Sequence, residues 1–276
     1  MNVKGMSLER IQSLDYFEMI GVVKETNRPP GGSSSIRGVA LNSFLNEKSK
    51  VLEVGTSTGV TAIELAKMVK CNIQAIDIND ESLKEARARA EAAAVGQYID
   101  FSVGDASQTK FDDESFDMVF CGNVTSYFDS KEKVIDEFNR VLVPNGHIAA
   151  IPMYYIDKPS EELVNKVSEA INVDITPLYL KDWVKYYDMP CFENVWMENY
   201  RFDRVSDENV ARYVDSIFSQ PHLAELDEER KAALYDRYRY FMFLFRDNLS
   251  LMGYTPMLLR KALTKDEPEL FVSSKV

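Results

Sequence analysis

The chain has 276 residues, of which 45% are hydrophobic and 28% are charged, and its formal net charge at pH 7 is -12. This composition is typical of a globular protein with one core and an appendage. The negative charge, together with the lack of a dense lysine and arginine run, argues against nucleic acid as a partner. We therefore expect a small-molecule partner.

We expect no segment of the kind that enters or crosses a membrane. Its first twenty residues mix charged with apolar side chains, unlike a signal peptide, and no apolar run approaches the length of a membrane span. These features predict a cytoplasmic protein that does not bind membranes.

Cysteine and histidine are too few and too scattered for a disulfide framework or a metal site. The cysteines Cys71, Cys121 and Cys191 are odd in number and form no CxxC pair. The two histidines, His147 and His222, are also far apart in sequence. We expect no metal site.

The first fifty residues predict two helices, at about 7–23 and 34–45, joined by "KETNRPPGGSSSIR". The run Pro29 to Gly32 ends the first helix, and Ser33 to Ser35 can cap the second. The "NRPPGG" segment is either a linker that carries this cap or a lid loop over a ligand.

Strand and helix patterns alternate from Lys50 to Met153. Short apolar strands separated by helical segments indicate right-handed βαβ crossovers and a parallel sheet. Such open sheets bind ligands at the carboxyl ends of their strands. In chain order the segments are "KVLEV", "VTAIELAKMV", "NIQAID", "DESLKEARARAEAAA", "IDFSVGD", "FDMVFCGN", "KEKVIDEFNRVL" and "HIAAIPM".

The pattern changes after Pro152. Two helices are expected, then a β-rich stretch, then a long aromatic helical stretch and a final strand. The corresponding segments are "SEELVNKVSEAI", "PLYLKDWVKYY", "FENVWMENYRF", residues 207–251 and "PELFVSSKV".

These elements divide the chain into three parts. Residues 1–48 form N-terminal helices and a lid loop, and residues 206–251 form a helical cap insertion. Residues 49–205 and 252–276 form the α/β core.

The stretch "VLEVGTSTGV" places two glycines, Gly55 and Gly59, after the first buried strand. Glycines in such a turn let backbone N–H groups approach a ligand, and the next helix presents its positive N-terminus. The turn departs from the dinucleotide fingerprint G-x-G-x-x-G, because Ser57 and Val60 occupy its second and third glycine positions. A dinucleotide and S-adenosylmethionine are both candidate ligands.

Three acidic residues end successive strands. Asp77 follows Gly55 at the spacing of an acid that accepts hydrogen bonds from ribose hydroxyls, which both ligands carry. Glu53 is expected close to the turn, where a carboxylate favours an ammonium and opposes a pyrophosphate. Asp105 can accept from an adenine amino group, or it can be an ordinary turn residue.

Taken together, five motifs resemble those of class I S-adenosylmethionine-dependent methyltransferases of the small-molecule type. The resemblance covers about residues 50–152 and implies a Rossmann-like α/β fold, with a seven-stranded, mostly parallel sheet whose last strand is reversed. The motifs are "VLEVGTSTG", "AIDIND", "VGDAS", "FDMVFCGN" and "RVLVPNGHIAAI".

The resemblance implies S-adenosyl-L-methionine as cofactor and assigns residues to it. It implies that Glu53 and the turn residues Gly55, Thr56, Ser57 and Gly59 bind the methionine end of the cofactor. It implies that Asp77 and Ile78 bind the ribose and adenine, and that Asp105 and Ala106 bind the adenine edge. Asn123 is assigned to the same site.

Two positions depart from the family pattern. Ser57 stands where the family often has glycine, and its Cβ would either weaken binding or bring a hydroxyl to the ligand. Asn145 replaces a glycine in "PNG", which is tolerable because asparagine enters the left-handed region more readily than most residues.

Methyl transfer is an in-line displacement, so the protein chiefly aligns the reactants and excludes water. A base is needed only for an acceptor that is protonated at neutral pH. Neither His147 nor His222 is an obvious candidate, and no catalytic residue is assigned.

The acceptor pocket is expected above the strand ends, built by residues 123–127, residues 153–155 and the helical insertion. A stripe of Tyr235, Tyr238, Met242 and Phe245 is either core packing or pocket lining. Substrate contacts are expected from Tyr127, Tyr154, Tyr155 and Tyr238.

Two kinds of charged acceptor fit the insertion. Arg237 and Arg239 could bind an acidic acceptor, whereas tyrosine faces could surround a cation. The sequence does not decide between them.

Alternatives to a small-molecule methyltransferase stay open. One is a nicotinamide-dependent oxidoreductase, and another is a protein that binds S-adenosylmethionine without catalysis. Methylation of a macromolecule is a further alternative, its RNA branch being disfavoured by the acidic charge. A homodimer is also left open.

Overall fold

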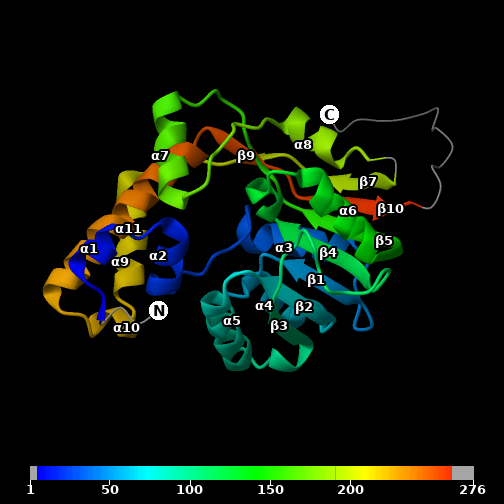
Figure 1. The fold of residues 1–276 in the computed structure, drawn as a ribbon, viewed down its shortest axis with the longest axis horizontal. Coiled ribbons are helices and arrows are strands. Elements are labelled where there is room, and N and C mark those ends of the chain that lie inside the picture. The colour runs from blue at the N-terminus through cyan, green and yellow to red at the C-terminus, as the bar shows by residue number, and fades with distance from the viewer. Residues whose placement is uncertain (1–4, 190, 263–276) are drawn as a thin grey trace.

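The computed structural model describes residues 5–189 and 191–262 and contains a seven-stranded sheet in the order β3-β2-β1-β4-β5-β10-β7 (Figure 1). Strands β1 to β5 are parallel, and β10 runs antiparallel to both β5 and β7. The α/β fold with a reversed last strand is thus confirmed. The strands are β1 (Lys50–Val54), β2 (Asn72–Asp77), β3 (Ile99–Val103), β4 (Phe116–Gly122), β5 (Leu142–Ala150), β7 (Phe192–Met197) and β10 (Met257–Lys261).

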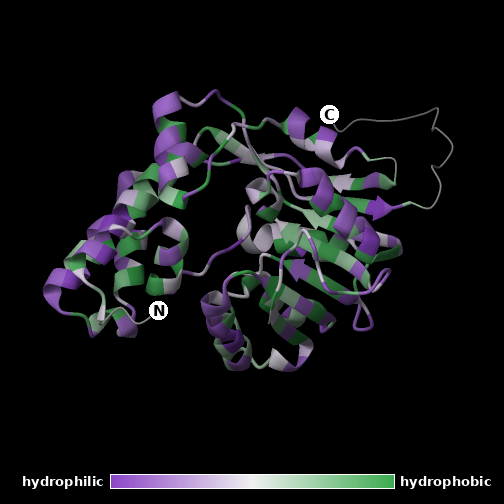
Figure 2. Cartoon of the chain, in the orientation of Figure 1, coloured by the Kyte–Doolittle hydropathy of each residue, from purple (hydrophilic) through white to green (hydrophobic). Residues whose placement is uncertain are grey.

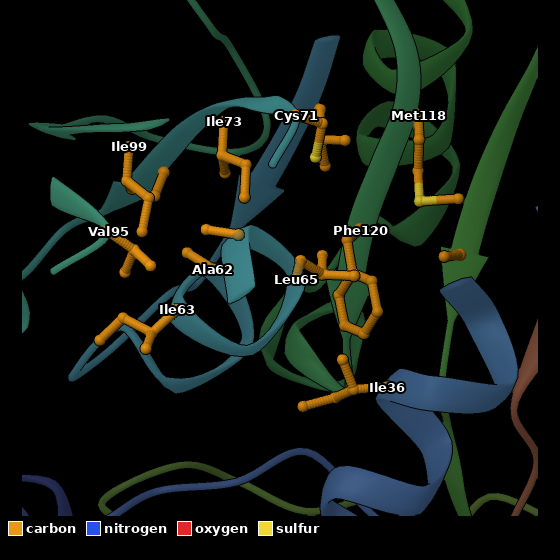
Figure 3. Packing of buried hydrophobic residues seen from close by; sticks show 14 of the residues in the cluster. Ile36, Ala62, Ile63, Leu65, Cys71, Ile73, Val95, Ile99, Met118 and Phe120 are labelled. Carbon is orange, nitrogen blue, oxygen red and sulfur yellow. The ribbon is translucent and has the colours of Figure 1, made fainter. Parts of the chain in front are cut away.

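Helices cover both faces of the sheet because the strands carry apolar side chains on both sides. Val51 faces α3 (Gly32–Asn42), α4 (Val60–Val69) and α5 (Asp80–Ala92), whereas its neighbour Leu52 faces α6 (Lys131–Val141) and α8 (Leu180–Tyr187). Figure 3 shows the first of these cores, where Ile36, Leu65 and Phe120 pack together.

The remaining helices form a separate bundle, here called the cap, beside the sheet (Figure 1). Their apolar faces turn toward one another, and their outer faces are polar (Figure 2). The cap is therefore a second hydrophobic core. It contains α1 (Leu8–Gln12), α2 (Tyr16–Val23), α7 (Glu161–Ile171), α9 (Asp207–Phe218), α10 (Pro221–Ala224) and α11 (Glu228–Leu249).

The N-terminal region differs from the expectation of two continuous helices. Helix α1 ends before Ser13, and α2 restarts because Asp15 and Glu18 form a reciprocal capping box. Both short helices pack in the cap, whereas α3 packs on the sheet.

The expected serine cap of α3 is wrong. The helix begins after Gly31, which has φ of 75° and makes no side-chain cap, and the Ser33 hydroxyl instead donates to Glu64 at 2.7 Å. A Cβ at residue 31 would lie 2.5 Å from the Tyr254 ring, so this start of the helix requires glycine.

A small antiparallel sheet, not expected from sequence, joins the cap to the core. Its order is β6-β9-β8, with β6 (Met153–Tyr155), β8 (Tyr200–Arg201) and β9 (Met252–Tyr254). Strand β9 follows α11 and leads into β10, so it carries the chain from the cap back to the main sheet.

Three further observations complete the fold. Short 3-10 turns occupy Gly96–Tyr98 and Val124–Tyr127. The expected final strand "PELFVSSKV" lies outside the described residues. Within the described ranges no helix combines the length and apolar character that crossing a membrane requires.

We expect Gly59→Ala to destabilise the fold by about 2 kcal/mol or more, because an alanine there combines a left-handed backbone with a steric clash. Gly59 has φ of 80°, and an added Cβ would lie 2.8 Å from the Cβ of Ala86. Urea unfolding measures the change. Gly21→Ala is the control, since that α2 position has open space, and it should stabilise by up to about 1 kcal/mol. Equal effects of the two variants would contradict this account of the turn.

Candidate functional site

The glycine turn between β1 and α4 is held against the end of β2 by backbone hydrogen bonds. The N–H groups of Gly55 and Thr56 both donate to the Ile76 carbonyl, at 2.9 and 3.0 Å. Gly55, Ser57 and Gly59 all have positive φ, at 69°, 50° and 80°. The turn therefore curls over the carboxyl ends of both strands.

Close packing explains the glycine at residue 55. A Cβ there would lie 2.6 Å from Val124, which follows β4. Ser57 adopts the left-handed conformation that glycine adopts most easily, which explains why this position often carries glycine in the family it resembles. Its hydroxyl accepts a hydrogen bond from the Asn27 side chain at 3.4 Å, so it contacts the "NRPPGG" segment.

Glu53 projects beneath the turn, as the sequence predicts, and its carboxylate is buried. The Thr56 hydroxyl donates to it at 2.7 Å, and the Thr61 hydroxyl and Ala62 N–H also stabilise its charged form. Burial nevertheless raises the pKa of Glu53 to about 7. In this structure Glu53 thus holds the turn through Thr56.

Asp77 ends β2 beside the turn. It accepts hydrogen bonds from the N–H groups of Ser57 at 2.8 Å and Asn79 at 2.9 Å, and burial raises its pKa. Asn79, not Asp77, caps α5. The next side chain, Ile78, is 79% exposed, which leaves an apolar surface at the position expected for adenine.

The other three assigned residues lie at the neighbouring strand ends. Asp105 is exposed and accepts from the N–H and hydroxyl of Ser107, which makes it a turn residue whatever else it binds, and Ala106 is buried. The Asn123 oxygen accepts from Ser126 and from the Met153 N–H at 2.9 Å, so it joins the ends of β4 and β6.

The four tyrosines assigned to the acceptor have different surroundings. Tyr154 packs in the sheet core and accepts from Thr255, and Tyr155 donates to Asn248 of α11 at 2.7 Å. Tyr127 instead lies near Tyr16 and Phe17 of the cap, whereas Tyr238 is fully buried in the cap core.

Sequence reasoning missed Glu25, which lies just after α2 and is only 7% exposed. Its carboxylate accepts hydrogen bonds from the hydroxyls of Tyr16 at 3.2 Å and Tyr213 at 3.1 Å, and Tyr238 also faces it. We call these four residues the Glu25 cluster. Nothing local marks Glu25, because the three tyrosines come from three different cap helices.

The "NRPPGG" segment lies over the carboxyl end of the sheet. Asn27 contacts Ser57, and a Cβ at Gly122, the last residue of β4, would lie 3.7 Å from Pro29. The ring of Phe17 on α2 meets that of Tyr127 edge-on, with centroids 5.5 Å apart. Segment and cap therefore both contact the residues that follow the strands.

A cavity of about 180 Å³ opens between the cap and the start of α5. Gly21 and Lys24 line it from the cap, and Thr58, Asn79 and Ser82 line it from the sheet side. It lies beside the end of β2.

The arginines of α11 are engaged by the protein itself. Arg237 donates two hydrogen bonds to the Leu14 carbonyl and lies over the Phe241 ring, and Arg239 lies over Phe243. Arg237 therefore fastens α11 to the turn between α1 and α2. The described residues contain no group of three or more His, Cys, Asp or Glu side chains suited to a metal ion.

Comparisons with known proteins agree with this geometry. Residues 52–150 match the family model described as "Methyltransferase domain". An uncharacterized protein of Haemophilus influenzae is 32% identical over 173 residues, which are 62% of this chain and 69% of that protein. A sterol 24-C-methyltransferase of Aspergillus fumigatus is 35% identical over 102 residues, but these cover 37% of this chain and only 27% of that enzyme.

Among solved structures, the MccD protein superposes with a TM-score of 0.72 at 25% identity, over 85% of this chain and 99% of that one. The chain belongs to the class I S-adenosylmethionine-dependent methyltransferases. Its cofactor is S-adenosylmethionine, and the nicotinamide alternative is set aside.

The raised pKa of Glu53 predicts a pH-dependent effect of Glu53→Gln. The folded state retains the Glu53 proton up to about pH 7, whereas the unfolded state loses it near 4.5, so this group's contribution to stability is lost as pH rises between those values. Relative to the wild type, the variant should gain about 2 to 3 kcal/mol of unfolding free energy between pH 5 and pH 8. Urea unfolding at the two pH values measures it, and a difference that does not change with pH would contradict the burial argument.

Asp77→Asn tests the proposed ribose contact. The amide keeps one acceptor oxygen for the Ser57 N–H, loses the hydrogen bond from the exposed Asn79 N–H, and removes the charge that strengthens hydrogen bonds from ribose hydroxyls. S-adenosylmethionine affinity should therefore fall about tenfold, with a loss of stability of about 1 kcal/mol. Calorimetry of cofactor binding is the measurement. Asp80→Asn, at an exposed carboxylate in the first turn of α5, should leave affinity unchanged. Unchanged affinity in a folded Asp77→Asn protein would refute the assignment.

Proposed function

We propose that the protein transfers the methyl group of S-adenosylmethionine to a small-molecule acceptor bound between the cap and the carboxyl edge of the sheet. The observation that carries this proposal is the position of Glu25. Its carbonyl accepts from Thr58 of the glycine turn at 3.5 Å, while its side chain reaches Tyr213 in the cap. One residue thus joins the proposed cofactor turn to the helices that enclose a second substrate.

The residues fit the proposed cofactor chemically. A methionine ammonium above the turn would stabilise the charged form of buried Glu53, and Asp77 with exposed Ile78 supplies an acceptor and an apolar surface for the nucleoside. Asp105, Ala106 and Asn123 complete the proposed site along the ends of β3 and β4. The bound cofactor supplies an electrophilic methyl group on a sulfonium.

The protein's part in the reaction is alignment and exclusion of water. The rigid turn fixes the cofactor, and the cap holds the acceptor on the opposite side of the methyl group, which an in-line displacement requires. The apolar rings of Phe17 and Tyr127, which meet across the junction of cap and sheet, help keep water out.

A small acceptor suits this enclosure better than a macromolecule. The "NRPPGG" segment and α2 both contact the strand ends, which leaves little room for an extended polymer, and the charge of -12 opposes nucleic acid. The sterol methyltransferase similarity gives this proposal further support, although it covers only about a quarter of that enzyme's length.

If the segment and cap close over bound ligand, both should gain hydrogen-exchange protection when S-adenosylhomocysteine is added. Lids lie at the low-stability end of a molecule and order on binding. We expect larger gains at residues 25–35 and 207–249 than in β1 or β4, measured by mass spectrometry of exchanged peptides. Identical exchange with and without ligand would make the cap a structural or oligomerisation element.

Turnover distinguishes an enzyme from a protein that only binds the cofactor. Formation of S-adenosylhomocysteine with a panel of cationic, neutral and acidic small molecules should identify at least one acceptor class. Tight cofactor binding with no turnover on any of them would favour the non-catalytic alternative.

A further inference from the structure

Glu25 is a buried carboxylate without a cationic partner in the described part of the chain. It is 7% exposed, and its side-chain contacts are tyrosine hydroxyls. Buried carboxylates are normally paired with a cation or held neutral, because removing the charge from water is costly. Arg28 acts on Tyr213 through its charge, but no ion pair to Glu25 is formed among the described residues, so burial raises the pKa of this carboxyl.

A second observation at the same place points to a ligand. The Tyr238 side chain is fully buried, and its hydroxyl has no hydrogen-bond partner of ordinary geometry although it faces Glu25. A buried polar atom left unpaired costs about 1 to 3 kcal/mol, so such atoms usually have a partner. A ligand N–H group would satisfy both the Tyr238 oxygen and the carboxylate.

The backbone next to the Glu25 side chain is anchored to the glycine turn. The Arg89 guanidinium donates to the Lys24 carbonyl at 2.9 Å and to the Thr58 hydroxyl at 3.0 Å, which fixes the backbone before Glu25 on the glycine turn. The Glu25 side chain then points from this anchored backbone into the cap. Glu25 is thus joined to the glycine turn by its backbone and to the cap by its side chain.

We propose that Glu25, with Tyr16, Tyr213 and Tyr238, binds a cationic nitrogen of the acceptor. This inference rests on the proposed function and adds the substrate class: a small molecule that carries a protonated amine or an alkylammonium group. The carboxylate supplies the opposite charge, the hydroxyls accept N–H hydrogen bonds, and the aromatic rings favour a cation beside them.

The surroundings of the cluster disfavour the alternative of an acidic acceptor. Arg237, one of the two arginines that could have bound an acid, is committed to the Leu14 carbonyl, and Arg239 lies over Phe243. An acid beside Glu25 would meet like charge. Burial raises the pKa of Glu25 whereas the tyrosine hydroxyls oppose this, and an incoming cation would stabilise the charged form further.

The test is a cation titration of the full-length protein labelled with ¹³C in the tyrosine rings, carried out with S-adenosylhomocysteine present. Methylammonium chloride is the probe, sodium chloride is the ionic-strength control and sodium propionate is the anionic control. Tyr213→Phe and Tyr238→Phe assign the resonances of the cluster. Calorimetry with S-adenosylhomocysteine on the same samples tests the proposed function separately.

Two variants separate a binding site from a structural contact. Glu25→Gln keeps the size and hydrogen-bonding ability of the side chain but removes its charge. Asp215→Asn is the matched control, because Asp215 on α9 accepts a hydrogen bond from Tyr235 of α11 at 2.7 Å but does so at an exposed position. Thermal unfolding shows that both variants are folded.

We expect methylammonium, and neither control salt, to shift the cluster resonances in the wild type and in Asp215→Asn. The affinity should be at least about tenfold weaker in Glu25→Gln, as expected for loss of a buried charge-assisted contact. Equal affinity in Glu25→Gln, a response to propionate instead, or no shift in the wild type would overturn the proposal and leave Glu25 as a contact between cap helices. If the protein did not bind S-adenosylhomocysteine, that result would instead contradict the proposed function.

Discussion

The site depends on the hydrogen bonds that join the glycine turn after β1 to the end of β2. Two backbone N–H groups of the glycine turn share the Ile76 carbonyl, and a third, from Ser57, donates to the Asp77 carboxylate. These bonds force the turn into left-handed backbone conformations that glycine accepts readily. They also bring two carboxylates, Glu53 below and Asp77 beside, to one edge of the sheet. The proposed cofactor site is a consequence of this arrangement.

The cap is connected to that edge at few points, and one of them is unusual. Glu25 has its backbone on the turn and its charge among cap tyrosines, so movement of the cap changes the surroundings of a buried carboxylate. A site of this kind can couple closure to occupancy, because closing without a cation encloses an unpaired charge. The proposed acceptor class and the proposed closure thus have one physical origin.

The sequence predicted the sheet well because its signals are local. Apolar strands, intervening helices and strand-end acids each occupy a few consecutive residues, and a parallel sheet brings their ends together without further information. The left-handed conformation of Asn145, which lies in β5 and has φ of 63°, was foreseeable from its residue type. The break between α1 and α2 also had a local signal, the capping pair Asp15 and Glu18. The prediction of one helix over 7–23 overlooked this pair.

The cap and the second sheet were less predictable because their partners are distant in sequence. The aromatic stripe on α11 divides: Tyr238 is buried beside Glu25, while Tyr235 binds Asp215 at the surface. Periodicity places both on one helical face but does not tell which helix covers each. For the same reason Glu25 could not be found, since a glutamate before a proline-rich turn ordinarily faces water.

Calorimetry with S-adenosylmethionine, S-adenosylhomocysteine and NAD tests the central claim most directly, namely that this turn and its acids form a site for a sulfonium amino acid nucleoside. A carboxylate beneath the turn favours an ammonium and opposes a pyrophosphate. The account predicts saturable binding of the first two ligands and none of NAD. Binding of NAD without binding of S-adenosylmethionine would contradict it.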